Sequence, residues 1–435
     1  MNRNWLALSV ILSSSVFLHA PAAVASTYYI DSQGGDDRSD GQTEATPWKS
    51  HTMAQKAKLR PGDTVMLKRG SRFSGPIHIA ESGTAKEPIL LTAYGKGEAP
   101  RLTNPDDRDM NGNCIRLSGS YLIVEKLHFH DTPPTKRASR LKSIFQMGAV
   151  FNMFGATHNI IRDNLFSKCT KAIQSTGEFT LITRNQMDGP SHALWTRPGA
   201  TGAWGPMGIQ LGIGNQEVSH NTIKNYLTLN SPYGSDGGAI ELDDGRYHKK
   251  NVYIHHNYTE GNAGFFESSW KADYKPMVQK VSNLRIAFNV SYDAQSFVYM
   301  HAPCIDTVFD NNTVIRTNDF GSPMYDIVYT AFPGILFRNN LYVGTAKCFR
   351  GSPYKKASRV VAKNNWFWDV DSAKSDGDPG LLNMPRRDFR LRSDSPLRGK
   401  ALNLSKHYAT DSAGNLLPKT GAWDIGAFSY VEITK

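Results

Sequence analysis

The sequence has little cysteine, and after its first 25 residues it has no hydrophobic stretch long enough to cross a membrane. The spacing of the cysteines matches no zinc-binding pattern, and it leaves both disulfides and buried free thiols open. Motifs for nucleic-acid recognition are also missing. We therefore expect no membrane insertion, no nucleic-acid partner and no metal held by cysteine. The four cysteines are Cys114, Cys169, Cys304 and Cys348.

The sequence also lacks the leucine spacing of leucine-rich repeats and the Trp-Asp periodicity of propellers, which disfavours both folds. Aromatic residues make up 11% of the chain and glycine occurs 37 times. This composition suits many short strands joined by tight turns better than it suits helices. We expect an all-β protein.

The N-terminus has the pattern of a secretory signal peptide. Arg3 is followed by an apolar run from Trp5 to Leu18 and by the small residues Ala23 and Ala25, which flank Val24. We predict that residues 1–25 are removed and that the protein is secreted or periplasmic.

The charge of the chain favours an acidic partner. Lysine and arginine together number 50 against 39 acidic residues, a net charge of +11. For an exported protein, an acidic polysaccharide is the polyanion that fits best. Scattered surface lysines explain the charge equally well. We expect a monomer.

One phrase recurs along the chain: two or three apolar residues, two polar ones, an asparagine, and then an apolar or aromatic pair. Copies follow one another at solenoid spacing, so each step predicts one coil. We expect each asparagine to adopt a left-handed turn and to hydrogen-bond the asparagines of the neighbouring coils. The phrase is centred on Asn164, Asn185, Asn221, Asn257, Asn289, Asn312, Asn340 and Asn365, and an earlier copy has Leu127 in this position.

These repeats predict an all-β fold, a single-stranded right-handed parallel β-helix (a solenoid) with a short N-terminal capping helix. The capping helix is expected between Trp48 and Leu59, ahead of a turn at Arg60 to Asp63. We expect one β-helix domain over residues 26–435. Its parts are an N-terminal cap with the first coils (26–110), central coils with the asparagine ladder (111–370) and a C-terminal cap (371–435).

Both ends of the chain resemble a known superfamily. The segments YYIDSQGGDDRSDGQTEATPWKS, LRPGDTVMLKRGSRFSG and SGTAKEPILLTAYG are similar to the N-terminal region of pectate-lyase-like, right-handed parallel β-helix proteins. DPGLLNM, DFRLRSDSPLRG and DIGAFSY resemble the C-terminal region of the same superfamily. The resemblance implies the β-helix fold and an activity among polysaccharide lyases, glycoside hydrolases and uronate epimerases.

The strand ahead of each asparagine phrase contains a candidate active site. When the apolar residues of these strands are taken as inward-facing, Gln174, Gln210, Glu241 and Glu267 fall on one outward face of successive coils. Stacked carboxylates repel one another, which favours a functional cause over a solvated acidic face. We predict as catalytic candidates Glu241, Asp243, Glu267, Lys271, His248 and Arg246. We predict as substrate-binding candidates Gln174, Gln210, Trp195, Arg197, Trp270, Tyr274, Tyr299 and His301.

A lyase needs positive charge on the uronate carboxylate and a base for the adjacent proton. Oxygen ligands for Ca²⁺ are available from Asp236, Glu241, Asp243 and Asp244. Lys271, His248 or Arg246 is the expected base, and Tyr274 a possible acid. The Glu241-x-Asp243 pair resembles the calcium-binding pair of the chondroitinase B and alginate lyase family, whereas GRYHKK and FFESSW replace that family's Asn-Lys-Ser segment and Arg-His pair.

We therefore predict a polysaccharide lyase that cleaves an acidic exopolysaccharide of a capsule or biofilm matrix by β-elimination. Three alternatives stay open. A glycoside hydrolase would use Glu241 or Asp243 with Glu267 as its carboxylate pair. A matrix protein would bind the polysaccharide without cleaving it, and an epimerase would only invert a uronate. His255 and His256 lie within an asparagine phrase, and we expect both to be structural.

Overall fold

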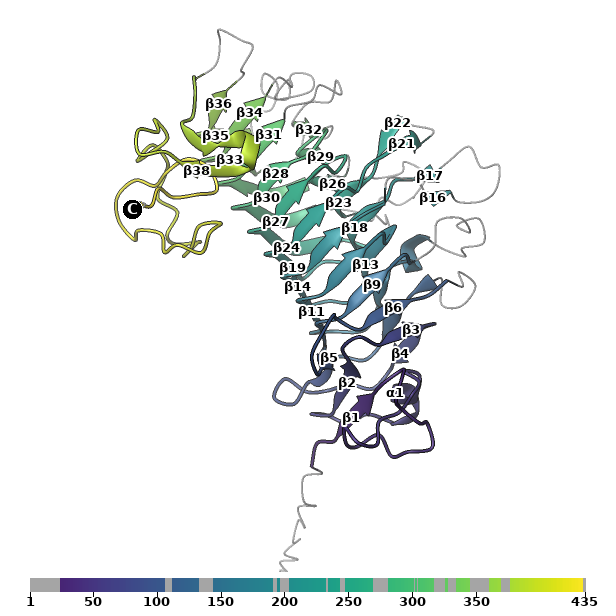
Figure 1. Cartoon of the computed structure of the whole chain (residues 1–435). Helices are drawn as coiled ribbons and strands as arrows, with labels where there is room; N and C mark the ends of the chain where they lie inside the picture. Colours follow the sequence, from purple (N-terminus) through teal and green to yellow (C-terminus); the bar gives the residue numbers. More distant parts are fainter. Residues whose placement is uncertain are drawn as a thin grey trace, which may run out of the picture.

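The chain folds into an elongated stack of coils built from three parallel sheets (Figure 1). The structure is a computed structural model that describes residues 24–105, 112–132, 144–190, 194–195, 203–231, 234–242, 247–268, 281–300, 302, 304–316, 325–327, 334–344, 360–368 and 376–432. Most of the predicted signal peptide therefore lies outside the described residues. Among the described residues, no helix is long and apolar enough to span a membrane.

The described strands of each coil pass in turn through the three sheets, here named A, B and C. Sheet A consists of β1 (Thr27–Ile30), β2 (Thr64–Lys68), β5 (Ile89–Tyr94), β8 (Leu122–Glu125), β11 (Ile160–Arg162), β14 (Thr180–Thr183), β19 (Gln216–Ser219), β24 (Lys249–His255), β27 (Val281–Ala287), β30 (Cys304–Asp310), β33 (Ile335–Arg338) and β35 (Val360–Lys363). Sheet B consists of β3 (Arg72–Ser74), β6 (Arg101–Thr103), β9 (His128–His130), β12 (Leu165–Ser167), β15 (Gln186–Asp188), β20 (Thr222–Lys224), β25 (Tyr258–Glu260), β28 (Val290–Tyr292), β31 (Thr313–Arg316), β34 (Leu341–Gly344) and β36 (Trp366–Trp368). Sheet C consists of β4 (Ile77–Ile79), β7 (Ile115–Leu117), β10 (Val150–Asn152), β13 (Lys171–Ser175), β18 (Met207–Leu211), β23 (Gly238–Glu241), β26 (Phe266–Ser268), β29 (Val298–Met300) and β32 (Tyr325–Ile327).

Short hairpins and 3₁₀ turns lie outside the three sheets. Hairpins are formed by β16 (Leu194–Trp195) with β17 (Ala203–Trp204), β21 (Thr228–Ser231) with β22 (Gly234–Asp236), and β37 (Leu381–Asn383) with β38 (Asp388–Leu391). Two 3₁₀ turns span η3 (Ile144–Gln146) and η4 (Met384–Arg386). The all-β parallel β-helix predicted from the sequence is confirmed.

The asparagine ladder is present, with one correction to its backbone. Asn221 accepts hydrogen bonds at Oδ1 from the backbone N and side-chain Nδ2 of Asn185, and its own N and Nδ2 donate to Oδ1 of Asn257. The left-handed conformation belongs to the residue before each asparagine, such as His220 (φ 56°) and His256 (φ 55°). That residue makes the turn, which leaves the asparagine buried and free to link the coils.

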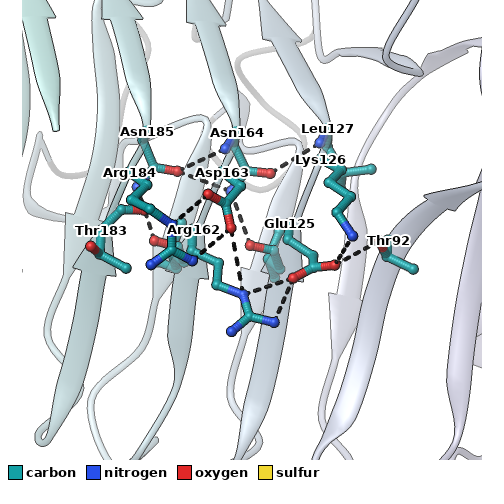
Figure 2. A network of polar contacts seen from close by, with 12 residues as sticks. Thr92, Glu125, Lys126, Leu127, Arg162, Asp163, Asn164, Thr183, Arg184 and Asn185 are labelled. Atoms are coloured by element: carbon teal, nitrogen blue, oxygen red, sulfur yellow. Dashed lines mark hydrogen bonds and ion pairs between the residues drawn. The ribbon is translucent and has the colours of Figure 1, made fainter. Parts of the chain in front are cut away.

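On the early coils, ion pairs and hydrogen bonds link the residues around the left-handed turn that precedes each asparagine (Figure 2). Glu125 is 4% exposed, and its carboxylate accepts from Thr92 Oγ1 at 3.1 Å and from Arg162 Nε at 2.7 Å. Lys126 Nζ lies 2.8 Å from the same carboxylate. Burial opposes the ionised form, but the hydrogen bonds from Lys126, Arg162 and Thr92 outweigh it and lower the pKa of Glu125.

Replacing Glu125 by glutamine should make the fold less sensitive to acid. A carboxylate whose pKa is lowered by folding stabilises the protein above its ordinary value of 4.5 and loses that contribution as the pH falls through the folded-state pKa. The stability gap between wild type and Glu125→Gln should be largest at neutral pH and shrink in acid. Urea midpoints over this pH range measure the gap, with the exposed Glu87→Gln as control. A gap that stays constant into acid would contradict the assignment.

The two ends of the described chain are built differently. At the N-terminal end the expected helix is confirmed but is only one turn long, α1 (Met53–Lys56), and Trp48, Ala54 and Leu59 join the main core around it. The C-terminal segment packs along the side of the later coils (Figure 1). There it forms a second core, in which Phe389 and Trp423 join Phe288 and Leu341.

Candidate active site

The predicted row of polar residues exists on sheet C. Strand pairing places Gln174 beside Gln210, Gln210 beside Glu241, and Glu241 beside Glu267. The register extends in both directions, because Glu267 is followed by Tyr299 and Gln174 is preceded by Phe151 and Arg116. We call these residues the sheet C row; they are Arg116, Phe151, Gln174, Gln210, Glu241, Glu267 and Tyr299.

The middle of the row is covered rather than open to solvent. Gln174 and Gln210 are 0% exposed and Glu241 is 5% exposed. Glu267 and Tyr299 are half-buried.

Lys171 is a site residue that our sequence prediction missed, as it also missed Arg116 and Phe151. It is 0% exposed, and its Nζ donates to Gln174 Oε1 at 3.0 Å and to Gln210 Oε1 at 2.5 Å. Two successive residues, Ala172 and Ile173, both face the core. Lys171 and Gln174 can therefore both lie on the outer face, which strict alternation would forbid.

A buried ammonium group in this position sets the charge of the row. Removing a charge from water is costly unless it is hydrogen-bonded and paired, and the two amide oxygens provide part of that compensation. Gln210 accepts a hydrogen bond from Lys171 and pairs with Glu241 on the next strand. The positive charge of Lys171 therefore lies one strand away from a carboxylate. Nε2 of Gln210 is buried and has no hydrogen-bond partner among the described residues.

Space for the Glu241 side chain comes from Gly238 at the start of β23. A Cβ atom on Gly238 would lie 3.3 Å from Glu241 Oε1, so the carboxylate folds back over the glycine. Farther along the row, Arg116 Nη2 donates to Asn113 Oδ1 at 3.1 Å, and the guanidinium carbon lies 5.7 Å from the ring centre of Phe151. The row therefore has a cation and an aromatic ring at one end and carboxylates farther along.

The described residues do not test the calcium site expected from the sequence, because two of its four predicted ligands, Asp243 and Asp244, lie outside them. Burial raises the pKa of Asp236, and its carboxylate accepts from Ser231 Oγ at 3.0 Å and from the Gly237 backbone at 2.8 Å, which engages both oxygens locally. Calcium takes six to eight oxygen ligands. Among the described residues, no three carboxylates lie close enough to share an ion. We assign no step of the reaction to calcium.

Several predicted site residues are not part of the described row. His248 is exposed, and its Nε2 lies 2.8 Å from Ser282 Oγ of sheet A. The backbone of Trp195 lies in β16, whereas its side chain is not described. The remaining candidates lie outside the described residues: Asp243, Asp244, Arg246, Arg197, Trp270, Lys271, Tyr274 and His301.

The fold and the row together define a parallel β-helix protein of the class that acts on polysaccharides. Residues 49–267 match the chondroitinase B family, and the chain belongs to that family. This match spans β2 to β26 and includes Lys171, Glu241 and Glu267.

Individual relatives include both lyases and a hydrolase. The chain superposes on pectate lyase Pel9A with a TM-score of 0.61, covering 94% of this chain and 97% of that one at 15% identity. A rhamnogalacturonan lyase matches with a TM-score of 0.52 over 83% of this chain and 92% of its own at 13% identity. These likenesses show the fold. Over 76 residues, 17% of this chain, the sequence is 42% identical to a lacto-N-biosidase of Bifidobacterium longum subsp. longum, and this spans 5% of that relative's length.

Proposed function

We propose that the protein is an exported polysaccharide lyase that cleaves a uronate-containing exopolysaccharide by β-elimination on the outer face of sheet C. The observation that carries the proposal is the placement of a buried cation, Lys171, beside a row that contains Glu241 and Glu267. Such a site combines a positive field with carboxylate bases. The net charge of +11 supports an anionic substrate.

The elimination requires one proton removed and one proton returned. A carboxylate of the row, Glu241 or Glu267, takes the proton from the carbon next to the uronate carboxylate. The electron pair left on that carbon forms a carbon–carbon double bond, and the bond to the glycosidic oxygen breaks. Tyr299, the strand neighbour of Glu267, is the candidate that donates a proton to the leaving oxygen.

The remaining members of the row have supporting roles in this proposal. Gln174 and Gln210 are fully buried and engage Lys171, so we assign them to positioning the ammonium group instead of direct substrate contact. Arg116 lies on an earlier coil of the same face, where it suits a carboxylate of a neighbouring unit. Phe151 is 5% exposed and lies beside the Arg116 guanidinium, so we assign it to supporting Arg116.

A retaining glycoside hydrolase is the second candidate, because one observation favours it directly. Glu241 and Glu267 are neighbours on adjacent strands, whose spacing is about 4.8 Å. Retaining hydrolases hold their two carboxyl groups about 5 to 5.5 Å apart. The local similarity to a lacto-N-biosidase supports the same reaction class.

One assay separates these reactions. Purified protein is incubated with a panel of acidic polysaccharides while ultraviolet absorbance and reducing ends are both followed, with and without EDTA. The lyase proposal predicts that both rise together, because each elimination creates a double bond conjugated with the uronate carboxylate. Reducing ends without absorbance would contradict it and identify a hydrolase. Loss of activity in EDTA would show that the reaction requires a metal ion.

A further inference from the structure

Three histidines gather on the outer side of sheet A, away from the sheet C row. His255 is the last residue of β24, and His220 and His256 occupy the left-handed turn positions of two successive coils. Ring nitrogens from all three lie within 4.8 Å of one another. His220 is exposed, whereas His256 is half-buried and His255 is 9% exposed. Neutral imidazole is the commonest metal ligand in proteins.

The outer nitrogens of two of these rings are already anchored. Nε2 of His255 lies 3.2 Å from Glu217 Oε1, and Nε2 of His256 lies 3.3 Å from the backbone oxygen of Thr410. A histidine that binds a metal almost always donates its other ring N–H to a carboxylate or a backbone carbonyl. These two contacts orient the rings as metal-bound histidines are oriented, with Nδ1 directed inward.

The inward nitrogens face each other closely. Nδ1 of His255 lies 2.7 Å from Nδ1 of His256. If both Nε2 atoms carry their protons, as the two anchoring contacts require, each neutral ring presents a lone pair to the other. Two such lone pairs need a proton or a cation between them.

We propose that His220, His255 and His256 form a binding site for a divalent transition metal such as Zn²⁺, and that Glu217 and Thr410 orient two of its ligands. Three imidazoles suit Zn²⁺, Ni²⁺ or Cu²⁺ better than the hard ions Ca²⁺ and Mg²⁺. Exposed His220 leaves the remaining coordination position to water. Stacking of His255 on Tyr253 at 3.8 Å and of His256 on Phe288 at 5.4 Å holds the rings in place.

The site joins parts of the chain that are distant in sequence. His220 and His256 belong to neighbouring coils, and Thr410 belongs to the C-terminal segment, 154 residues from His256. A bound ion would therefore fasten that segment to the coils. This inference does not depend on the reaction proposed for the sheet C row, because the two sites lie on different sheets.

Zinc binding by the untagged full-length protein tests the proposal. After EDTA treatment and buffer exchange, titration calorimetry with Zn²⁺ should show one ion per chain, and the ion should raise the thermal midpoint. His220→Ala should lower the affinity at least about tenfold, and Glu217→Gln should lower it by about 10- to 100-fold. The exposed His407→Ala is the matched control and should bind as wild type does.

Measurements on these variants distinguish a loss of folding from a loss of metal binding. His220 is exposed, so His220→Ala should keep the circular dichroism spectrum and the thermal midpoint of the metal-free wild type. Absence of stoichiometric zinc on the folded wild type would overturn the proposal. Wild-type affinity in the variant that lacks all three histidines would also overturn it, since the ion would then sit elsewhere.

Discussion

Replacing Glu241 by glutamine is expected to lower the turnover number at least about a hundredfold, the usual contribution of a general acid or base. Glutamine keeps the size of the side chain and still fits over Gly238, but it cannot accept the substrate proton. Glu267→Gln should have an effect of the same order, because the two residues are neighbours on β23 and β26. Initial rates on the substrate found in the polysaccharide panel measure both losses.

The control for these variants is Glu87→Gln, which removes an exposed carboxylate near the N-terminal end. It should retain the wild-type rate. The thermal midpoints of Glu241→Gln and Glu267→Gln should stay close to that of the wild type, so that lost activity is not lost folding. Wild-type rates in both variants would show that the sheet C row is not where the reaction occurs.

Replacing Lys171 by methionine should also lower turnover at least about a hundredfold, because the row then loses its buried positive charge. Methionine is unbranched and fills much of the same space. The pH profile should change as well. Without the ammonium group nearby, the carboxylates of the row ionise less readily, so the acid limb of the rate profile should move to higher pH.

The pH profile distinguishes an electrostatic role of Lys171 from a purely structural one. A structural role would reduce the rate at every pH by a similar factor and would leave the limb where it is. Lys171→Arg should not restore the wild-type rate, because the planar guanidinium needs more room than Gln174 and Gln210 leave around an ammonium group. Full rescue by arginine would show that charge alone suffices.

The β-helix and the register of the sheet C row were predictable from the sequence, because each coil repeats the same apolar markers. Ile173, Ile209, Ile240 and Phe266 lie opposite one another in the structure, as aligned. Residues that stand at the same distance in sequence from this marker on successive strands must form a row across the sheet. That is why Gln174, Gln210, Glu241 and Glu267 could be placed together without coordinates.

Lys171 could not be placed in this way, because alternation puts it on the inner side with Ile173. Only the two consecutive inward residues Ala172 and Ile173 bring it to the outer face. The sequence did contain one signal, a lysine at the start of the otherwise uncharged strand KAIQS, and a charged residue there needs a buried partner.

The histidine cluster had a clearer signal in the sequence, although we expected His255 and His256 to be structural and made no prediction for His220. The phrases VSHNTI and YIHHNYT both have histidine immediately before the asparagine, and repeats stack equivalent positions. This stacking predicts that His220 and His256 are neighbours. The anchoring of His256 by Thr410 was beyond prediction, because it depends on how the C-terminal segment packs along the side of the coils.

The most direct test of the central claim is a crystal structure of Glu241→Gln soaked with an oligosaccharide of the cleaved polysaccharide. The account predicts sugar units along the outer face of sheet C, with the scissile linkage over Glu267 and position 241 and with further units toward Phe151 and Arg116. An oligosaccharide bound to another face of the β-helix, with the sheet C row still covered, would contradict it.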